Sequence, residues 1–450
     1  MQSESIYRAR DAEPGPLAGV RVVDLTIARA GPTCVRQLAD MGAQVIQVGQ
    51  PGRPDLGGSD SDNLHRGKRS ALIDLKHPDG LRAFGRLLEG ADVLVENFRS
   101  DVKRRLSIDY PSLSVRHPRL IYASLSGFGQ EGPYANRPGL DQVIQGMAGL
   151  MSVTGPPGAG PWRAGIAISD TASGTFLTQG ILAALYSRER TGRGQWVHTS
   201  LLEAMVNMMD FQAVRWLVDG VVPGQRGNDH PTLFPMGAFA TQDGLINLAV
   251  LDGWPRFAEA IGLPELGDDP RFATLEVRLK NREALRGLVE DALIQRTTAH
   301  WIEVFAAADL PCGPILSMDE VFADPQVQQL QLTRPVTHEE RGRFGSDVLV
   351  VELEDDLGER LKLKPRNINI LLVAAVGRDA RRHRMRLDPS GHGGCRPDER
   401  KAAARALQDG TRRARSGVFA AGLAVHHRDH DPQLPRGPRR RRRLRRGRLD

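Results

Sequence analysis

One carboxylate in this 450-residue sequence stands where it can act as a nucleophile. Asp170 lies in the segment GIAISDTASG (165–174), immediately before an apolar stretch from Thr171 to Arg188 that predicts a long helix. An aspartate at a helix N-cap accepts hydrogen bonds from first-turn amides, and this structural role alone would account for it. The position also suits chemistry, because the helix dipole and nearby amides keep the carboxylate ionised and the flanking glycines let a thioester approach. Attack on a thioester would give a mixed acyl anhydride and release a thiolate.

No other motif in the sequence indicates a catalytic, dinucleotide or metal site. Residues 127–132 match the GxGxxG pattern, but Pro133 follows at once and predicts a loop, whereas a dinucleotide site needs a helix to open inside the motif. The sequence has no GxSxG, HExxH or P-loop lysine motif, and its histidines show no ligand spacing. We therefore expect no metal site and no tightly bound cofactor.

The first third of the chain predicts the elements that position Asp170. Apolar, β-branched runs alternate with helical patterns, among them 33–41 and 78–89, which indicates βαβ units and a doubly wound parallel sheet. The predicted strands are 19–25, 43–48, 71–75, 92–98 and 120–128. Ligands of such sheets lie beyond the carboxyl ends of the strands. Those ends are residues 26–32, 49–54, 76, 97–99 and 126–132.

Two further regions follow. Residues 201–218 predict one helix with a methionine-rich apolar face, which is typical of a core or dimer contact. Residues 222–330 predict a smaller α+β domain with a strand at 244–250, several amphipathic helices and a loop at 310–314.

Charge divides the chain into an acidic body and a basic tail. Residues 376–450 hold 22 Lys+Arg and 8 Asp+Glu, which leaves 39 basic and 46 acidic residues before them. Two interpretations of the tail stay open, a disordered basic arm that binds polyanions such as nucleic acid, or non-native sequence from a shifted reading frame. No apolar run has the roughly 20 residues of a membrane helix, and Cys34, Cys312 and Cys395 lie far apart. We expect a cytoplasmic protein that does not interact with membranes.

The sequence resembles the class III CoA-transferases, the formyl-CoA transferase and carnitine CoA-transferase type, from about Leu17 to about Val336. The motifs that carry the resemblance are GVRVVDLTIARAGP (19–32), GAQVIQV (42–48), HRGKRSALIDLKHPDG (65–80), ADVLVENFR (91–99), SGFGQEGPYANRPGLD (126–141), GIAISDTASG (165–174), RTGRGQWVHTSLLEA (190–204), LPCGPI (310–315) and VFADPQV (321–327).

The resemblance implies a fold and a mode of assembly. We expect a Rossmann-like large domain over 1–221, a small domain over 222–330 and a return segment toward the large domain over 331–375, in an interlocked homodimer. Residues 376–450 form the atypical tail.

The resemblance also implies an activity and a site. The enzyme would transfer CoA between an acyl-CoA donor and a small carboxylic acid, with Asp170 as the covalent nucleophile and the CoA thioester as substrate rather than cofactor. The implied CoA-binding positions are Arg29, Ala30, Ile73, Asp74, Leu75, Lys76, Asn97, Phe98 and Arg105. Lys76 and Arg105 suit phosphate contacts, although a solvated helix face accounts for Arg105 equally well.

Three departures from the family pattern keep alternatives open. Leu140 stands where related α-methylacyl-CoA racemases have a histidine base and transferases commonly have tyrosine. Gly49 replaces the usual glutamate, and the family's C-terminal LGEHT-like segment is missing. A racemase or epimerase on the same fold is one alternative, which leucine disfavours because it cannot move a proton. An inactive CoA-binding protein with a basic interaction arm is the other.

Overall fold

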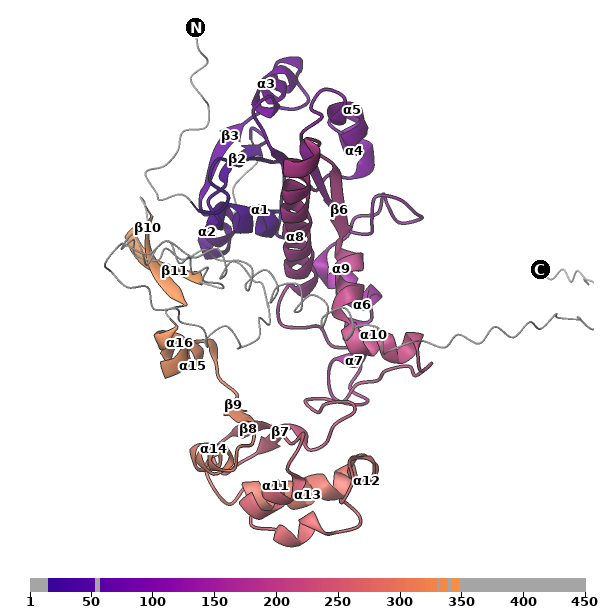
Figure 1. Cartoon of the computed structure of the whole chain (residues 1–450), viewed down its shortest axis with the longest axis vertical. Coiled ribbons are helices and arrows are strands. Elements are labelled where there is room, and N and C mark those ends of the chain that lie inside the picture. The colour runs from indigo at the N-terminus through magenta and orange to yellow at the C-terminus, as the bar shows by residue number, and fades with distance from the viewer. Residues whose placement is uncertain (1–14, 53–56, 331, 339–341, 349–450) are drawn as a thin grey trace, which may run out of the picture. The chain divides into compact units, whose positions relative to one another are not determined.

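A parallel sheet of six strands forms the centre of the first part of the chain (Figure 1). The computed structural model describes residues 15–52, 57–330, 332–338 and 342–348. The strand order is β3-β2-β1-β4-β5-β6, the order of a doubly wound nucleotide-binding sheet. The strands are β1 (Arg21–Asp24), β2 (Gln44–Gly49), β3 (Lys68–Leu72), β4 (Val93–Glu96), β5 (Ile121–Ser126) and β6 (Trp196–Ser200). The predicted doubly wound parallel sheet is confirmed.

Helices cover both faces of this sheet because its strands are apolar on both faces. Val22 packs with α1 (Ala30–Asp40) and α8 (Ile168–Thr191) on one face. Its neighbour Val23 points the other way and packs with α3 (Pro78–Leu88) and α5 (Tyr110–Ser114). The two cores fix the sheet, and with it the loops at the strand ends.

Shorter helices connect these layers. They are α2 (Gly58–His65), α4 (Ser100–Arg105), α6 (Asp141–Met147), α7 (Leu150–Val153), α9 (Leu201–Met208) and α10 (Asp210–Leu217). The prediction of one helix over 201–218 is wrong, because the backbone of Asp210 has φ of +43° and divides the segment into α9 and α10. Ser200 caps α9 by accepting the Glu203 N–H at 3.1 Å.

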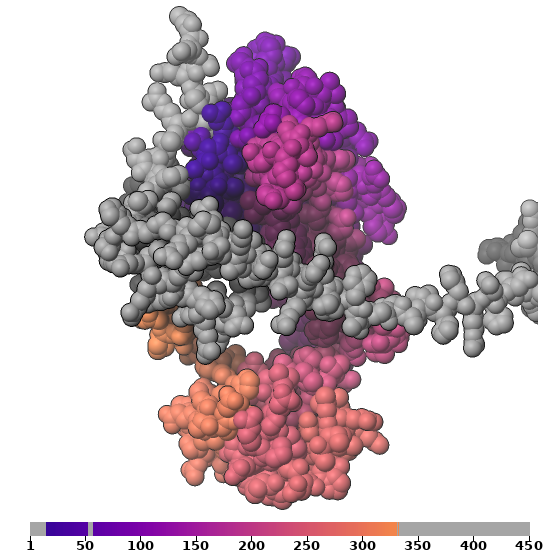
Figure 2. Space-filling view, viewed as in Figure 1, coloured from indigo at the N-terminus to yellow at the C-terminus, as the bar shows by residue number. Residues whose placement is uncertain are grey.

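A three-stranded antiparallel sheet with its own core forms a second body, drawn pink to orange in Figure 2. Its order is β7 (Met236–Ala240), β8 (Leu245–Ala249) and β9 (Cys312–Pro314). Its helices are α11 (Trp254–Ala260), a 3₁₀ turn (Pro264–Gly267), α12 (Leu275–Lys280), α13 (Arg282–Leu293) and α14 (Thr298–Ala307). The strand predicted at 244–250 is confirmed. The loop predicted at 310–314 is wrong in part, because β9 is too short for an alternating pattern to show.

The last described elements are α15 (Met318–Ala323), α16 (Pro325–Gln329) and an antiparallel pair, β10 (Thr333–His338) and β11 (Gly342–Val348). The tail predicted over 376–450 lies outside the described residues, as does most of the return segment predicted over 331–375. The domain boundaries stay a prediction. Within the described ranges, no helix is both long enough and apolar enough to cross a membrane.

Candidate active site

Asp170 lies in the first turn of α8, not at its N-cap. The helix begins at Ile168, so Asp170 is its third residue, and the N-cap residue Ala167 has no side chain able to cap. The predicted N-cap role is therefore wrong. The cap comes from another element, since Asp141 Oδ1 accepts hydrogen bonds from the Ser169 N–H at 2.9 Å and the Ser169 hydroxyl at 2.7 Å. The Asp170 carboxylate is thereby left without a local capping role.

Asp141 and Gln145 of α6 clamp the segment that leads into α8. Asp141 is buried, and its Oδ2 accepts a hydrogen bond from Gln145 Nε2 at 2.7 Å. Gln145 also donates to the Ile166 carbonyl at 3.1 Å and accepts the Ala164 N–H at 2.9 Å. The sequence analysis missed both residues. The signal that marks them is a carboxylate in the first turn of a helix with an amide one turn later.

The surroundings of Asp170 raise the pKa of its carboxyl to about 6. Burial is the main cause, the negative charge of Asp141 adds to it, and the positive charge of Arg29 opposes both. The sequence analysis expected the helix N-terminus to keep the carboxylate ionised, and it missed the burial and the like charge that raise the pKa. The carboxylate is still mostly ionised at neutral pH, and its raised basicity makes it a better nucleophile.

Close packing of α1 on α8 brings Arg29 and Ala30 near Asp170. A Cβ on Gly174 would lie 2.6 Å from the Ala30 carbonyl oxygen, so only glycine allows this approach. Gly174 is one helical turn after Asp170, which places the start of α1 beside the start of α8. Its observed role is helix packing, whereas the sequence analysis expected the glycines of this segment to admit a thioester.

The loop between β1 and α1 is fixed by Asn97. The Asn97 side chain accepts the Ile27 N–H at 3.0 Å and donates to the Ile27 carbonyl at 2.8 Å. Ala28 follows with φ of +65°, and Arg29 pairs with Asp60 at 2.5 Å. Asn97, a predicted CoA-binding residue, therefore positions the loop that carries Arg29, and neither contact uses its second N–H.

The other predicted CoA-binding residues follow β3 and β4 in the chain. The range Ile73–Lys76 follows β3, where the Ile73 N–H donates to the Gly49 carbonyl at 2.9 Å and the Lys76 side chain is exposed. The partly buried Phe98 follows β4, and the exposed Arg105 ends α4. The structure thus places residues 73–76 and Phe98 at the carboxyl ends of β3 and β4, with Arg29 and Ala30 beyond β1, whereas Arg105 lies one helix further along the chain.

A buried ion pair attaches α4 to the sheet. Lys103 donates to Glu96 Oε1 and to Gln130 Oε1, each at 2.7 Å, and Ser124 donates to the same Glu96 oxygen at 2.5 Å. Asn97 and Phe98 directly follow Glu96 in the chain, so this network fixes the strand end that carries them. Sequence reasoning missed it. The available signal was a glutamate at the end of a fully buried strand, which requires a partner.

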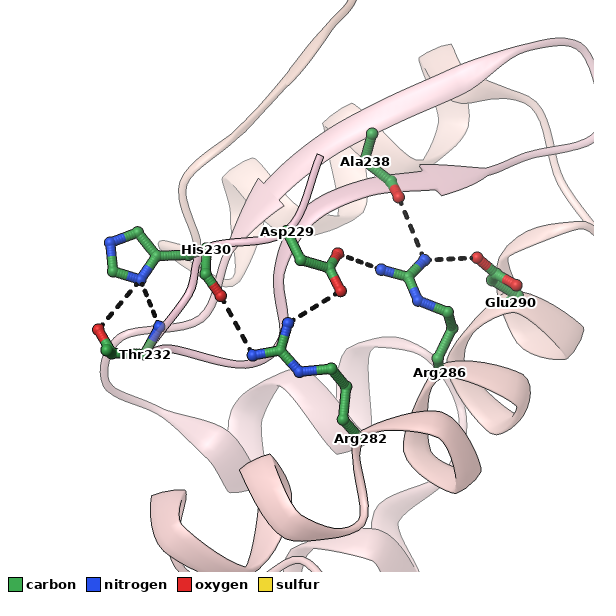
Figure 3. A network of polar contacts seen from close by, with 7 residues as sticks. All are labelled: Asp229, His230, Thr232, Ala238, Arg282, Arg286 and Glu290. Atoms are coloured by element: carbon green, nitrogen blue, oxygen red, sulfur yellow. Dashed lines mark hydrogen bonds and ion pairs between the residues drawn. The ribbon is translucent and has the colours of Figure 1, made fainter. Parts of the chain in front are cut away.

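A second carboxylate network lies beside the small sheet (Figure 3). Asp229 accepts hydrogen bonds from Arg282 at 3.0 Å and from Arg286, which also binds Glu290 at 2.7 Å. Arg282 donates to the His230 carbonyl at 3.1 Å. Residues 227–231 then line a cleft with β8 and residues 311–314. Paired on both oxygens, Asp229 stabilises this loop.

Comparison with known proteins identifies the family of this chain. A model of CoA-transferase family III matches residues 17–367. The chain is 38% identical to the succinate–glutarate CoA-transferase of Agrobacterium fabrum, over 70% of this chain and 83% of that one. It is 37% identical to the acetyl-CoA:oxalate CoA-transferase of Acetobacter aceti, over 69% and 84%. A crystal structure of a CAIB/BAIF family protein from Brucella suis matches with TM-score 0.64 and 33% identity, over 78% and 100%.

Proposed function

We propose a covalent mechanism for this chain, which belongs to CoA-transferase family III and transfers CoA between an acyl-CoA and a carboxylic acid. In the proposal the Asp170 carboxylate attacks the thioester carbonyl of the donor, the C–S bond breaks, and CoA leaves as a thiolate. The product is a mixed anhydride between Asp170 and the acyl group. The observation that carries the proposal is a partly buried carboxylate with a pKa of about 6, between the charges of Asp141 and Arg29.

The remaining steps return Asp170 to its carboxylate. The CoA thiolate attacks the Asp170 carbonyl of the anhydride, which releases the donor acid and leaves an aspartyl-CoA thioester. The acceptor carboxylate then displaces CoA to form a second anhydride. Attack of the thiolate on the acceptor's own carbonyl gives the new acyl-CoA and regenerates Asp170. Each step exchanges one acyl bond for another, so no external energy source is needed.

The test of this mechanism is the origin of the oxygen on Asp170. Turnover with an ¹⁸O-labelled acceptor acid should leave ¹⁸O in the peptide that contains Asp170, because the bridging oxygen of the second anhydride stays with the enzyme. Hydroxylamine added during turnover should give a hydroxamate on the same peptide. Exchange without label or hydroxamate at Asp170 would contradict the covalent mechanism. Asp309→Asn, a change at an exposed carboxylate, is the matched control for Asp170→Asn.

We propose that CoA binds beyond the carboxyl ends of β1, β3 and β4. We expect Arg29, Ala30, residues 73–76, Asn97, Phe98 and Arg105 to contact CoA, with the exposed Lys76 and Arg105 binding phosphates. The charges and exposure of these two side chains support that role. Lys76→Met and Arg105→Met should raise the KM for acyl-CoA about tenfold each and leave kcat unchanged. Loss of kcat without a change in KM would contradict this assignment.

We also propose that a second copy of the chain covers α9 and α10 in the interlocked homodimer that the family resemblance implies. These helices and the segment after them expose large apolar side chains, which a monomer rarely leaves in water. The exposed residues are Val206, Met208, Phe211, Val214, Trp216, Leu217, Val218, Val221 and Val222. Light scattering should give a dimer, and Leu217→Arg should shift it toward monomer. A monomeric wild-type protein would contradict the proposal.

A further inference from the structure

Arg163 is a half-exposed cation next to Asp141, the carboxylate that caps the helix of the candidate nucleophile. Its side chain is 48% exposed, and its Nη2 lies 4.0 Å from Asp141 Oδ2, beyond hydrogen-bond distance. Asp141 is already satisfied without it, because Ser169 and Gln145 donate to the two carboxylate oxygens. Among the described residues, the Arg163 guanidinium makes no hydrogen bond. Its five N–H donors are therefore available to a ligand.

The backbone that carries Arg163 is fixed on both sides. The Trp162 N–H donates to the Met151 and Thr154 carbonyls at 3.3 Å, and the Ala164 N–H donates to Gln145 at 2.9 Å. A fixed backbone limits the region that the Arg163 guanidinium can reach to the space near the start of α8. This geometry suits recognition of a small anion.

Arg163 and Ser169, the residue before Asp170, both lie next to the Asp141 carboxylate. Ser169, the neighbour of Asp170, binds Oδ1 of Asp141, whereas the Arg163 guanidinium lies nearest Oδ2. We infer that an acid whose reacting carboxylate lies at Asp170 can reach Arg163 with its other end, across the width of Asp141. A cation on the far carboxylate adds affinity without lowering the nucleophilicity of the near one.

The charges and the exposed apolar side chains around Asp141 also favour binding of the far carboxylate at Arg163. Asp141 and Asp170 repel an incoming acid, and Arg29 is already paired with Asp60. Leu140 precedes Asp141, and the Ile166 carbonyl accepts a hydrogen bond from Gln145. Their side chains are 66% and 63% exposed and offer apolar surface for a short methylene chain through dispersion contacts.

We propose that Arg163 binds the second carboxylate of a short-chain dicarboxylic acid and thereby selects diacids over monoacids as acceptors. This inference rests on the proposed covalent function of Asp170, whose site it extends. A guanidinium pairs with a carboxylate through two parallel N–H···O bonds, which a lysine cannot reproduce.

The experiment compares two acceptors of equal carbon number, glutarate and pentanoate, with acetyl-CoA as a donor that has no second carboxylate. Arg163→Met should lower kcat/KM for glutarate about 30- to 100-fold and change that for pentanoate less than about twofold. Arg163→Lys should fall between, and Arg82→Met, a change on the exposed face of α3, should match wild type. Equal losses on both acids, or none on either, would overturn the proposal.

A binding measurement separates this proposal from the covalent mechanism. Calorimetry of glutarate with Asp170→Asn protein in the presence of CoA needs no chemistry at Asp170. Adding Arg163→Met to that background should weaken glutarate binding by the same 30- to 100-fold factor. If Asp170 forms no intermediate but binding still depends on Arg163, the mechanism fails and the recognition proposal stands. Unchanged glutarate binding would overturn the recognition proposal by itself.

Discussion

Asp170 and Asp229 are both partly buried carboxylates near arginine, but their surroundings differ. Asp229 receives hydrogen bonds from Arg282 and Arg286 on its two oxygens, and both arginines also bind backbone carbonyls (Figure 3). Asp170 has Asp141 as a neighbouring like charge, and Arg29, the cation that lowers its pKa, is paired with Asp60.

This difference is the one we expect between a structural carboxylate and a reactive one. A buried carboxylate whose oxygens are saturated is a poor nucleophile but a strong link between segments. A carboxylate that is desolvated beside another negative charge is costly to ionise and correspondingly reactive. Such a cost at Asp170 is consistent with the proposed catalytic role, because enzymes commonly give up stability at functional sites.

The largest expected effect is the loss of activity in Asp170→Asn. The amide is nearly isosteric but cannot form the anhydride, so the CoA exchange rate should fall at least about 10³-fold. Chromatography of new acyl-CoA products measures it. Asp229→Asn should reduce exchange only as far as it unfolds the small sheet. A normal rate in folded Asp170→Asn protein would break the comparison.

The second effect is on stability and concerns the other carboxylate. Asp229→Ala leaves two arginines, 10% and 21% exposed, without their common partner. We expect it to lower the free energy of unfolding by about 3 kcal/mol, the usual cost of breaking a buried pair. Urea denaturation followed by the fluorescence of the buried Trp254 and Trp301 reports on this core. Asp268→Ala, at an exposed site whose backbone has φ of −102°, should change it by less than about 0.5 kcal/mol.

The third effect is a pair of opposite shifts in the pH profile. The proposed mechanism needs ionised Asp170, so kcat/KM should rise with pH through about 6 in the wild type. Asp141→Asn removes a charge that raises the Asp170 pKa and should move this limb to lower pH. Arg29→Met removes a charge that lowers the pKa and should move the limb to higher pH. Shifts of the same sign would refute this electrostatic account.

The smallest effect is a gain in stability on removing the Asp170 charge. The folded-state pKa is raised from 3.8 to about 6, so the favourable contribution of the protonated form is complete below pH 3.8 and is lost as pH rises through 6. At pH 7 to 8, Asp170→Asn should therefore stabilise the protein by about 1 kcal/mol, a value reduced for partial exposure. Below pH 3.8 the gain should vanish. Thermal unfolding across this pH range measures the difference.

Much of the fold follows from local patterns in the sequence. The runs 19–25, 43–48 and 92–98 became β1, β2 and β4 because β-branched apolar residues favour a strand buried on both faces. The helix predicted at 78–89 became α3, with Pro78 as its first residue. The short strand β6 was missed because its half-buried residues run directly into α9.

The candidate site likewise depends partly on local sequence patterns and partly on tertiary packing. The sequence by itself determined that Asp170 lies at the start of a long helix and that Arg29, Lys76 and Asn97 follow strand ends, because propensity and periodicity are local. Only the tertiary structure decided that Asp141, 28 residues before Ser169, caps this helix and raises the Asp170 pKa. Burial and charge–charge energies depend on distances in space, and packing of α1, α6 and α8 sets those distances.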